Sequence, residues 1–303
     1  MNLGYACINM ELNARKGDDR VTTNRTMIKR TFQEKGVDYT SELVLQNVAD
    51  LYSIIEWNEQ NNIKFFRLSS EMFPWASEYY KDWDNFPNIE KIKSILQDCG
   101  NLATKYGHRI TSHPGPFNVL VSPNENVVQN TITDLTIHAD IFDFMGLSRT
   151  PYNKLNIHCN GVYGDKESAM DRFCTNFERL PESVQTRLTV ENDDKATMYS
   201  VKDLYEGIHK RIGIPIVFDY HHYKFNTGGQ TEQEALELAL STWGDIKPVV
   251  HYSESKAEHE LNESIRPQAH SDLIKELPNT YGNDVDIMVE AKHKELAIEG
   301  FIK

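Results

Sequence analysis

The sequence predicts an α/β fold, a single (β/α)₈ TIM barrel with parallel strands. Three observations support this prediction: β-rich runs recur along the chain, helix-length amphipathic stretches separate them, and the 303 residues are the length that such a barrel needs. There is no repeat of fixed period and no linker-like tract. We therefore expect one domain over residues 1–303.

The predicted strands are short runs rich in β-branched and aromatic residues. In chain order they cover 3–8, 63–69, 109–113, 155–159, 187–191, 214–220, 248–253 and 285–290. The expected helices cover 41–61, 88–106, 125–142, 165–179, 200–210, 231–243, 270–276 and 291–299. Two polar insertions interrupt the alternation, at about 10–40 and at 253–269. Loops of that length are usually functional or disordered.

Composition limits the classes of function. The formal net charge of −13 argues against bulk attraction to nucleic acid, so any nucleic-acid site must be a local basic patch. Carboxylates gathered at a cation site would add to this negative charge. No stretch approaches the roughly 20 apolar residues of a membrane span, and the N-terminus lacks a signal-peptide pattern. We expect a cytoplasmic protein without membrane contact.

The four cysteines do not form a recognisable metal or disulfide pattern. They lie far apart and include no Cys-x-x-Cys pair, so neither a zinc knuckle nor a disulfide framework is indicated.

Ionisable residues gather at the carboxyl ends of the predicted strands, which converge on one face of such a barrel. The residues at or just beyond the ends of the third to eighth strands are His113, His158, Glu191, Asp219, His222, His251, His270 and Glu290. Imidazole and carboxylate ligands suit Zn²⁺, Mn²⁺ or Fe²⁺, and bridging carboxylates let several ions grip one phosphoryl group. Each residue alone could be an ordinary core or surface residue, but the whole set predicts a multinuclear metal site.

His221 and His222 are adjacent, so on an extended segment only one of them can face the metals. We assign His222, which makes an Asp219-x-x-His222 spacing. His221 is then expected to pack or to orient the ligands.

The first insertion reverses the charge of the chain locally. Residues 13–35 contain seven Lys and Arg residues against three acidic ones. The segment follows the first strand and therefore lies on the same face as the predicted ligands. It is either a DNA-phosphate contact or a solvated loop, and the sequence alone favours neither.

Several motifs together resemble the ultraviolet damage endonuclease family over residues 2 to about 294. They are Gly4-Tyr5-Ala6-Cys7-Ile8-Asn9, Phe66-Arg67-Leu68-Ser69-Ser70, Ser112-His113-Pro114-Gly115, Glu191-Asn192-Asp193-Asp194, Asp219-x-x-His222, His251-Tyr252-Ser253 and Met288-Val289-Glu290-Ala291-Lys292-x-Lys294. The resemblance implies a TIM barrel related to the type IV apurinic endonucleases. It also implies hydrolysis of the phosphodiester immediately 5′ to a cyclobutane dimer or 6-4 photoproduct, leaving a 3′-hydroxyl and a 5′-phosphate.

The resemblance further implies up to three divalent ions, with Mn²⁺ expected first and Zn²⁺ or Mg²⁺ in its place as less favoured choices. His113, His158 and Glu191 would hold one ion, and His222 and His270 would hold a third. The second would be held by Glu191, Asp219, His251 and Glu290. We predict Glu191, His113 and His251 as the catalytic residues.

The same resemblance implies the residues that contact damaged duplex DNA. Tyr5 and Asn9 match positions that probe the distorted bases, and Lys292 and Lys294 are expected to contact phosphates. Where the family places a Gln and a Tyr that probe the lesion, this chain has Pro116 and Phe117, so its lesion preference is expected to differ. We expect a monomer that associates with the nucleoid and uses no nucleotide cofactor.

A sugar isomerase or epimerase with a divalent metal is the chief rival interpretation, because such enzymes share the barrel and similar ligands. The number of predicted ligands exceeds what a one- or two-metal isomerase needs. The sequence also leaves open a general abasic-site endonuclease and a non-catalytic binding barrel.

Overall fold

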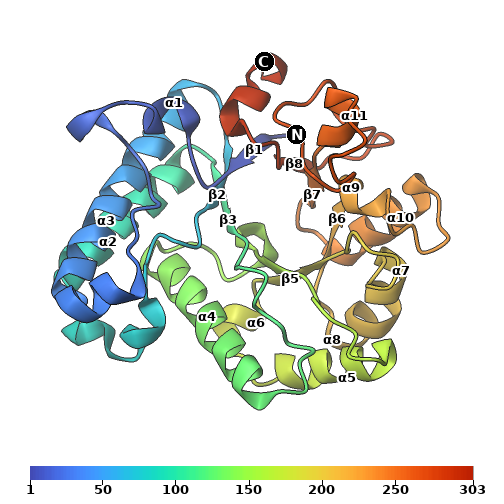
Figure 1. Ribbon diagram of the computed structural model, residues 1–303, viewed down its shortest axis with the longest axis horizontal. Helices are drawn as coiled ribbons and strands as arrows, with labels where there is room; N and C mark the ends of the chain where they lie inside the picture. Colours follow the sequence, from blue (N-terminus) through green and yellow to red (C-terminus); the bar gives the residue numbers. More distant parts are fainter. Residues whose placement is uncertain (303) are drawn as a thin grey trace.

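A closed barrel of parallel strands forms the centre of the computed structural model, which describes residues 1–302 except for the side chain of Asp18 (Figure 1). Within this range the strands are β1 (Leu3–Ala6), β2 (Phe65–Leu68), β3 (Arg109–Ser112), β4 (Leu155–Ile157), β5 (Leu188–Glu191), β6 (Ile216–Asp219), β7 (Val249–Tyr252) and β8 (Asp286–Val289). Each strand pairs with the next, and β8 closes the ring on β1. Every strand lies inside one predicted run, so the predicted fold class is confirmed.

Helices surround the strands on the outside of the ring (Figure 1). The longer ones are α2 (Lys29–Gln60), α3 (Ile89–Lys105), α4 (Glu125–Phe144), α5 (Lys166–Phe177) and α10 (Glu232–Leu240). The shorter ones are α1 (Met10–Asn13), α6 (Glu182–Gln185), α7 (Val201–Leu204), α8 (Lys210–Ile212), α9 (Tyr220–Tyr223) and α11 (Lys256–Glu260). A π-helical turn, Tyr205–His209, joins α7 to α8.

The sequence explains both the burial and the ends of these helices. In α3 the buried side chains include Ile92, Leu96 and Ala103, whose spacing places them on one face. The side chain of Thr231 accepts a hydrogen bond from the backbone of Glu234 at the start of α10, and Glu234 caps Thr231 in return. The helices therefore bury an apolar stripe against the barrel.

Three predicted boundaries or elements were wrong. Helix α2 begins at Lys29, inside the predicted insertion at 10–40, and is interrupted at Gly36, where φ is 68°. No helix forms over 270–276, because Glu254 draws this backbone into a turn: Ser271 N–H donates to the Glu254 carbonyl at 2.8 Å, and Lys275 N–H donates to its carboxylate at 2.8 Å. Over 291–299 only 3₁₀ turns form, since Lys294 has a left-handed φ of 55°.

The amino-terminal end of the barrel interior is closed by apolar packing and by the ion pairs of Asp286, of which the one with Arg109 is fully buried. Phe65, Val249 and Met288 pack together inside the ring. Arg109 on β3 lies 3.2 Å from the Asp286 carboxylate on β8, and both side chains are buried. Arg109 also donates to the carbonyls of Tyr152 and Lys247 at 2.8 Å each. The buried charges of Arg109 and Asp286 at this end are therefore satisfied by partners within the chain.

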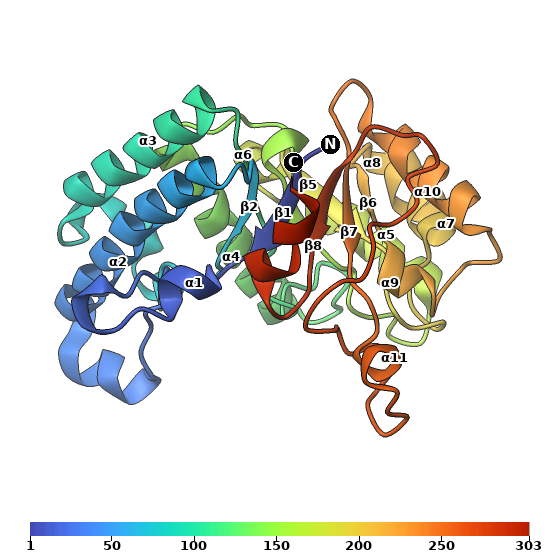
Figure 2. The same ribbon diagram turned by 90° about the horizontal axis from the view of Figure 1, so that it is seen from above.

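The carboxyl ends of the strands carry the two insertions. Figure 2 shows α1, which follows β1, and α11, which follows β7, on the same side of the barrel, with α11 projecting from it. Within residues 1–302, no helix has both the length and the apolar character needed to cross a membrane.

Candidate metal centre

Glu191, the last residue of β5, lies at the centre of a ring of histidines. Its Oε2 is 3.0 Å from His251 Nδ1 and 3.4 Å from His113 Nε2, and its Oε1 is 3.2 Å from His222 Nδ1 and 3.6 Å from His158 Nε2. These residues come from five different strand ends, which the closed barrel brings together. The structure thus assembles side chains that lie far apart in the sequence.

Asp219, Glu290 and His270 extend the cluster on the side of β6 to β8. Glu290 Oε1 is 3.2 Å from His251 Nδ1, and His270 Nδ1 is 3.9 Å from Glu290 Oε2. The rings of His222 and His270 have their centroids 6.4 Å apart. All of the predicted ligands therefore lie in one continuous group.

Four of the histidines place Nδ1 close to an oxygen atom that is not itself one of the candidate ligand atoms. His113 faces the Pro114 carbonyl at 3.2 Å, His158 faces Asp193 Oδ1 at 3.1 Å, His222 faces the Asn192 carbonyl at 2.9 Å, and His270 faces the Glu290 carbonyl at 3.2 Å. An imidazole whose Nδ1–H donates to such an acceptor presents the lone pair of Nε2 as a ligand. Metal-binding histidines almost always show this arrangement.

Within the cluster, two buried carboxylate oxygens have no hydrogen-bond partner among the described residues, namely Glu191 Oε1 and Asp219 Oδ2. A buried anionic oxygen without a partner is costly unless a cation satisfies it. Two groups have ligand atoms within 4.8 Å of one another: His113, His158 and Glu191, and Glu191, Asp219 and His251. The residues present therefore fit two neighbouring divalent ions that share Glu191.

Electrostatics favours the ligand forms of the central carboxylate and of one histidine. Although burial alone would raise it, the charges of His251 and His158 hold the pKa of Glu191 well below its usual range. Burial lowers the pKa of His113 to about 4, so this imidazole is neutral. For His222, burial opposes protonation, but the carboxylates of Asp219 and Glu191 raise its pKa well above the usual value. An ion that binds His222 must displace that proton.

Two cationic residues of the cluster were missed by the sequence analysis. Lys154 is buried inside the barrel, with Nζ 3.1 Å from His251 Nε2, and burial lowers its pKa to about 7. Arg67 on β2 is half-buried and contacts Glu290 Oε1. The sequence did carry a signal for both: Lys154 and His158 flank β4 an even number of positions apart and so face the same side, and Arg67 stands within a quoted motif.

A model of a known family, the UV-endonuclease UvdE, matches residues 1–303. The chain belongs to this family. Two curated proteins and one solved structure illustrate the similarity.

The UV-damage endonuclease of Schizosaccharomyces pombe is 38% identical over 98% of this chain, which spans only about half (49%) of that relative. The putative UV-damage endonuclease of Acanthamoeba polyphaga mimivirus is 31% identical over 98% of this chain and 89% of its own length.

The third is a solved structure, SacUVDE, with a TM-score of 0.82, 32% identity and coverage of 100% of this chain and 96% of its own. A D-tagatose 3-epimerase-like protein is less similar, with a TM-score of 0.55, 14% identity and coverage of 81% of this chain and 88% of its own. That second likeness shows a shared barrel fold and no more, so it does not favour the epimerase interpretation.

The residues that the UvdE resemblance assigned to DNA occupy different environments. Tyr5 and Asn9 are buried: Tyr5 donates to Asn58 at 2.7 Å and accepts from Asn9 at 3.0 Å, while Asn9 caps α1. Their assignment as lesion contacts stays a prediction, and in this structure both side chains serve packing. Pro116 and Phe117 are exposed after β3, and Phe117 is 64% accessible.

The two predicted phosphate contacts lie beyond β8. Lys292 is exposed and Lys294 is half-buried. In the basic first insertion, three cations already have acidic partners: Arg15 pairs with Glu11, Arg25 with Asp50 and Arg30 with Glu34. This pairing reduces the positive charge that the insertion offers to DNA.

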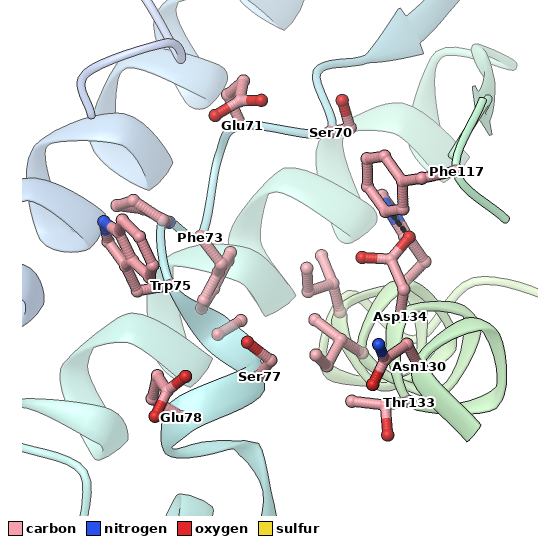
Figure 3. A pocket seen from close by; sticks show the side chains of 15 residues that line it. Ser70, Glu71, Phe73, Trp75, Ser77, Glu78, Phe117, Asn130, Thr133 and Asp134 are labelled. Carbon is pink, nitrogen blue, oxygen red and sulfur yellow. Dashed lines mark ion pairs between the residues drawn. The ribbon is translucent and has the colours of Figure 1, made fainter. Parts of the chain in front are cut away.

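A cavity of about 490 Å³ opens beside Phe117, between the loop after β2 and helix α4 (Figure 3). The ring of Phe117 lies between Ser70 on the loop and Asp134 on α4, while Trp75 lies farther along the loop. Apolar and polar side chains share its walls. No pattern in the sequence indicated this cavity.

Proposed function

We propose that this chain is a divalent-metal-dependent endonuclease that nicks duplex DNA immediately 5′ to ultraviolet photoproducts, leaving a 3′-hydroxyl and a 5′-phosphate. The observation that carries the proposal is the ring of histidines around Glu191, in which Nδ1 of His113, His158 and His222 each lies near an outside acceptor, in a member of the UvdE family. The two unpartnered carboxylate oxygens support the need for cations. We propose Mn²⁺ as the metal, with up to three ions bound.

The proposed ligand assignments follow the groups described above. His113, His158 and Glu191 would hold one ion, Glu191, Asp219, His251 and Glu290 a second, and His222 and His270 a third. Divalent ions in such a site supply a hydroxide near neutral pH and neutralise the charge that develops on the phosphoryl group.

The chain's own residues fix the geometry for that chemistry. The outside acceptors hold the imidazole rings in place, and Lys154 holds His251 so that its Nδ1 faces Glu191 and Glu290. Asn156 donates to Glu191 Oε2 and accepts from Thr189 at 2.7 Å, which fixes the central carboxylate. No Ser, Cys or Lys nucleophile is required.

We propose that the damaged nucleotides approach from the side of Phe117. An exposed aromatic ring at the edge of a cavity can stack on a base that leaves the helix. Damaged and poorly stacked nucleotides cost less to extrude than intact ones, which favours photoproducts over normal DNA. Pro116 offers no side-chain hydrogen bond to the lesion, so Phe117 would act by stacking.

The proposal covers residues 1–303 as one catalytic domain, with the last residue outside the described part of the chain. We propose that it acts as a monomer on damaged duplex DNA and without a nucleotide cofactor.

The test is a nicking assay with Mn²⁺ on end-labelled duplexes that carry one cyclobutane dimer, one abasic site or no damage. The expected result is cleavage 5′ to the dimer that EDTA abolishes, with the undamaged duplex left intact. Absence of cleavage of every duplex in the presence of Mn²⁺ would contradict the proposal. Equal cleavage of the undamaged duplex would contradict the damage specificity.

A further inference from the structure

The insertion after β7 builds a second charged feature, a groove of about 360 Å³ beside His270. We call it the insert groove. It is lined by residues of three separate segments, which include Asp194, Lys256, Arg266, Gln268, His270 and Lys292. The family resemblance implies that Lys292 contacts a phosphate, but neither it nor the proposed function gives a role to the insertion itself.

The two ends of the insertion are held together by backbone and side-chain hydrogen bonds. Ser255 and His270 form an antiparallel bridge, and Lys256 N–H donates to the Ala269 carbonyl at 2.7 Å. Ser255 Oγ donates to the Pro267 carbonyl at 2.8 Å, and His259 contacts the buried Glu254 carboxylate. The base of the insertion therefore fixes His270 and carries Arg266 next to it.

Three cations and one carboxylate face the insert groove. Lys256 is held by Asp272 at 3.2 Å and by Glu260 at 3.4 Å. Arg266 and Lys292 are exposed, and neither has a carboxylate within ion-pair distance in the described part of the chain. In a chain of net charge −13, two uncompensated cations next to the ligand cluster indicate a site for an anion.

The insert groove lies across the metal centre from Phe117. Phe117 follows β3 and the insertion follows β7, and these strands are four places apart in the closed ring of eight. A strand whose lesion meets Phe117 must pass over the metal centre to reach the insert groove. Because the proposed cut is immediately 5′ to the lesion, the part that reaches the groove is the 5′ part.

We propose that the insert groove binds a backbone phosphate of the cleaved strand on the 5′ side of the scissile bond, through Arg266 and Lys292. This inference rests on the proposed function. A guanidinium matches a phosphate with two parallel hydrogen bonds, and the ammonium of Lys292 adds a point charge. The insertion thereby fixes the register of the strand on the metal centre.

The first test compares the full-length chain with Arg266→Ala, Arg266→Lys and a matched control, Arg211→Ala, in Mn²⁺-dependent nicking of a dimer-containing duplex. Arg211 lies at the end of α8, before β6, and pairs with Asp171 at 2.7 Å, far from the carboxyl ends of the strands. We expect Arg266→Ala to raise KM by about tenfold, the value of one charge-assisted hydrogen bond, with kcat nearly unchanged. The dependence of log KM on log salt should become shallower by about 1. Arg266→Lys should recover part of the lost affinity and part of the salt dependence of KM. Arg211→Ala should match the unmodified chain in both.

The second test uses duplexes shortened close to the dimer on either side. Removal of the 5′ flank should abolish the difference between Arg266→Ala and the unmodified chain, whereas removal of the 3′ flank should preserve it. An unchanged KM for Arg266→Ala on the full duplex would overturn the inference, and so would an effect that disappears only with the 3′ flank. If the unmodified chain nicks no duplex at all, the proposed function fails instead.

Discussion

The two ends of the barrel interior use similar residue types in opposite ways. At the amino-terminal end, the single buried ion pair of Arg109 and Asp286 is surrounded by carbonyl acceptors and apolar packing. At the carboxyl end, Glu191 and Asp219 are equally buried, yet each keeps an oxygen without a partner. Only the second end needs a cation that the chain does not supply.

The comparison distinguishes a buried ion pair that stabilises the fold from buried carboxylates that are available to bind a cation. A buried ion pair whose hydrogen bonds are satisfied needs no further partner, whereas buried carboxylates that keep an unpartnered oxygen among imidazoles would be stabilised by a bound metal ion. Substitutions at the carboxyl end should therefore remove metal-dependent activity. Substitutions at the amino-terminal end should lower the stability of the fold.

Glu191→Gln should reduce Mn²⁺-dependent nicking by at least about a thousandfold, because the shared charge that holds two ions is lost and several kcal/mol of transition-state stabilisation go with it. Asp286→Asn, a buried carboxylate at the opposite end, is the matched control and should nick normally once folded. Nicking rates on the dimer duplex and circular dichroism spectra measure both. Undiminished turnover in Glu191→Gln would remove Glu191 from the mechanism.

Arg109→Met should lower the free energy of unfolding by about 1–3 kcal/mol, since the buried Asp286 loses the closer of its two cations and keeps only Lys247, at 3.3 Å. The folded protein should bind Mn²⁺ as before. Urea denaturation and Mn²⁺ titration at low temperature test the two statements separately. Loss of Mn²⁺ affinity without loss of stability would break the distinction between the two ends.

Lys154→Met should weaken Mn²⁺ binding by about 10- to 100-fold, the usual effect of removing the outer partner of a metal-binding histidine. The reason is the 3.1 Å contact that holds His251 with its Nδ1 toward Glu191. Lys247→Met, which removes a lysine paired with Asp284 and Asp286 at the other end, should leave Mn²⁺ affinity unchanged. Titration calorimetry measures both, and equal affinities would remove Lys154 from the metal centre.

The sequence predicted the strands of the fold better than the segments that connect them. All eight strands were located within residues 1–302, because each buried run is short, apolar and followed by an amphipathic stretch. The segment 270–276 was misread as a helix because its apolar spacing looked helical. The tertiary contact that decides its structure, with Glu254, is invisible in a local pattern.

The sequence predicted more of the candidate ligands than of the groups that surround and orient them. The candidate ligand residues lie at strand ends, so strand boundaries alone place them together. The groups that orient the imidazoles include the carbonyls of Pro114, Asn192 and Glu290, and a backbone atom carries no sequence signal. Arg266 was overlooked for a similar reason, since only the folded insertion brings it beside Lys292.

The affinity for Mn²⁺ should rise with pH above the usual range of histidine titration. The pKa of His222 is raised by Asp219 and Glu191 despite its burial, so without metal it keeps a proton that Mn²⁺ must displace. The stability that this protonated His222 gives to the metal-free fold is present below its unfolded pKa and is lost as pH rises through the raised folded value. Calorimetry in buffers of different ionisation enthalpy should detect the released proton. An affinity independent of pH would contradict the assignment of His222.

Pro116→Gln should change the ratio of cyclobutane dimer to 6-4 photoproduct cleavage by about 2- to 10-fold, the value of one neutral hydrogen bond. The cleavage rate of the better substrate should change less, because residue 116 is exposed and outside the ligand cluster. Parallel assays on the two lesions measure the ratio. An unaltered ratio would show that residue 116 takes no part in recognition.

Counting the metal ions tests the central claim most directly. Mn²⁺ would be titrated into the full-length chain after chelation and dialysis, and bound metal would be measured by elemental analysis and calorimetry. We predict at least two tightly bound ions per chain, one for each ligand group around Glu191, and fewer in Glu191→Gln. A folded chain that binds no Mn²⁺ tightly, or binds it equally well in Glu191→Gln, would contradict the account.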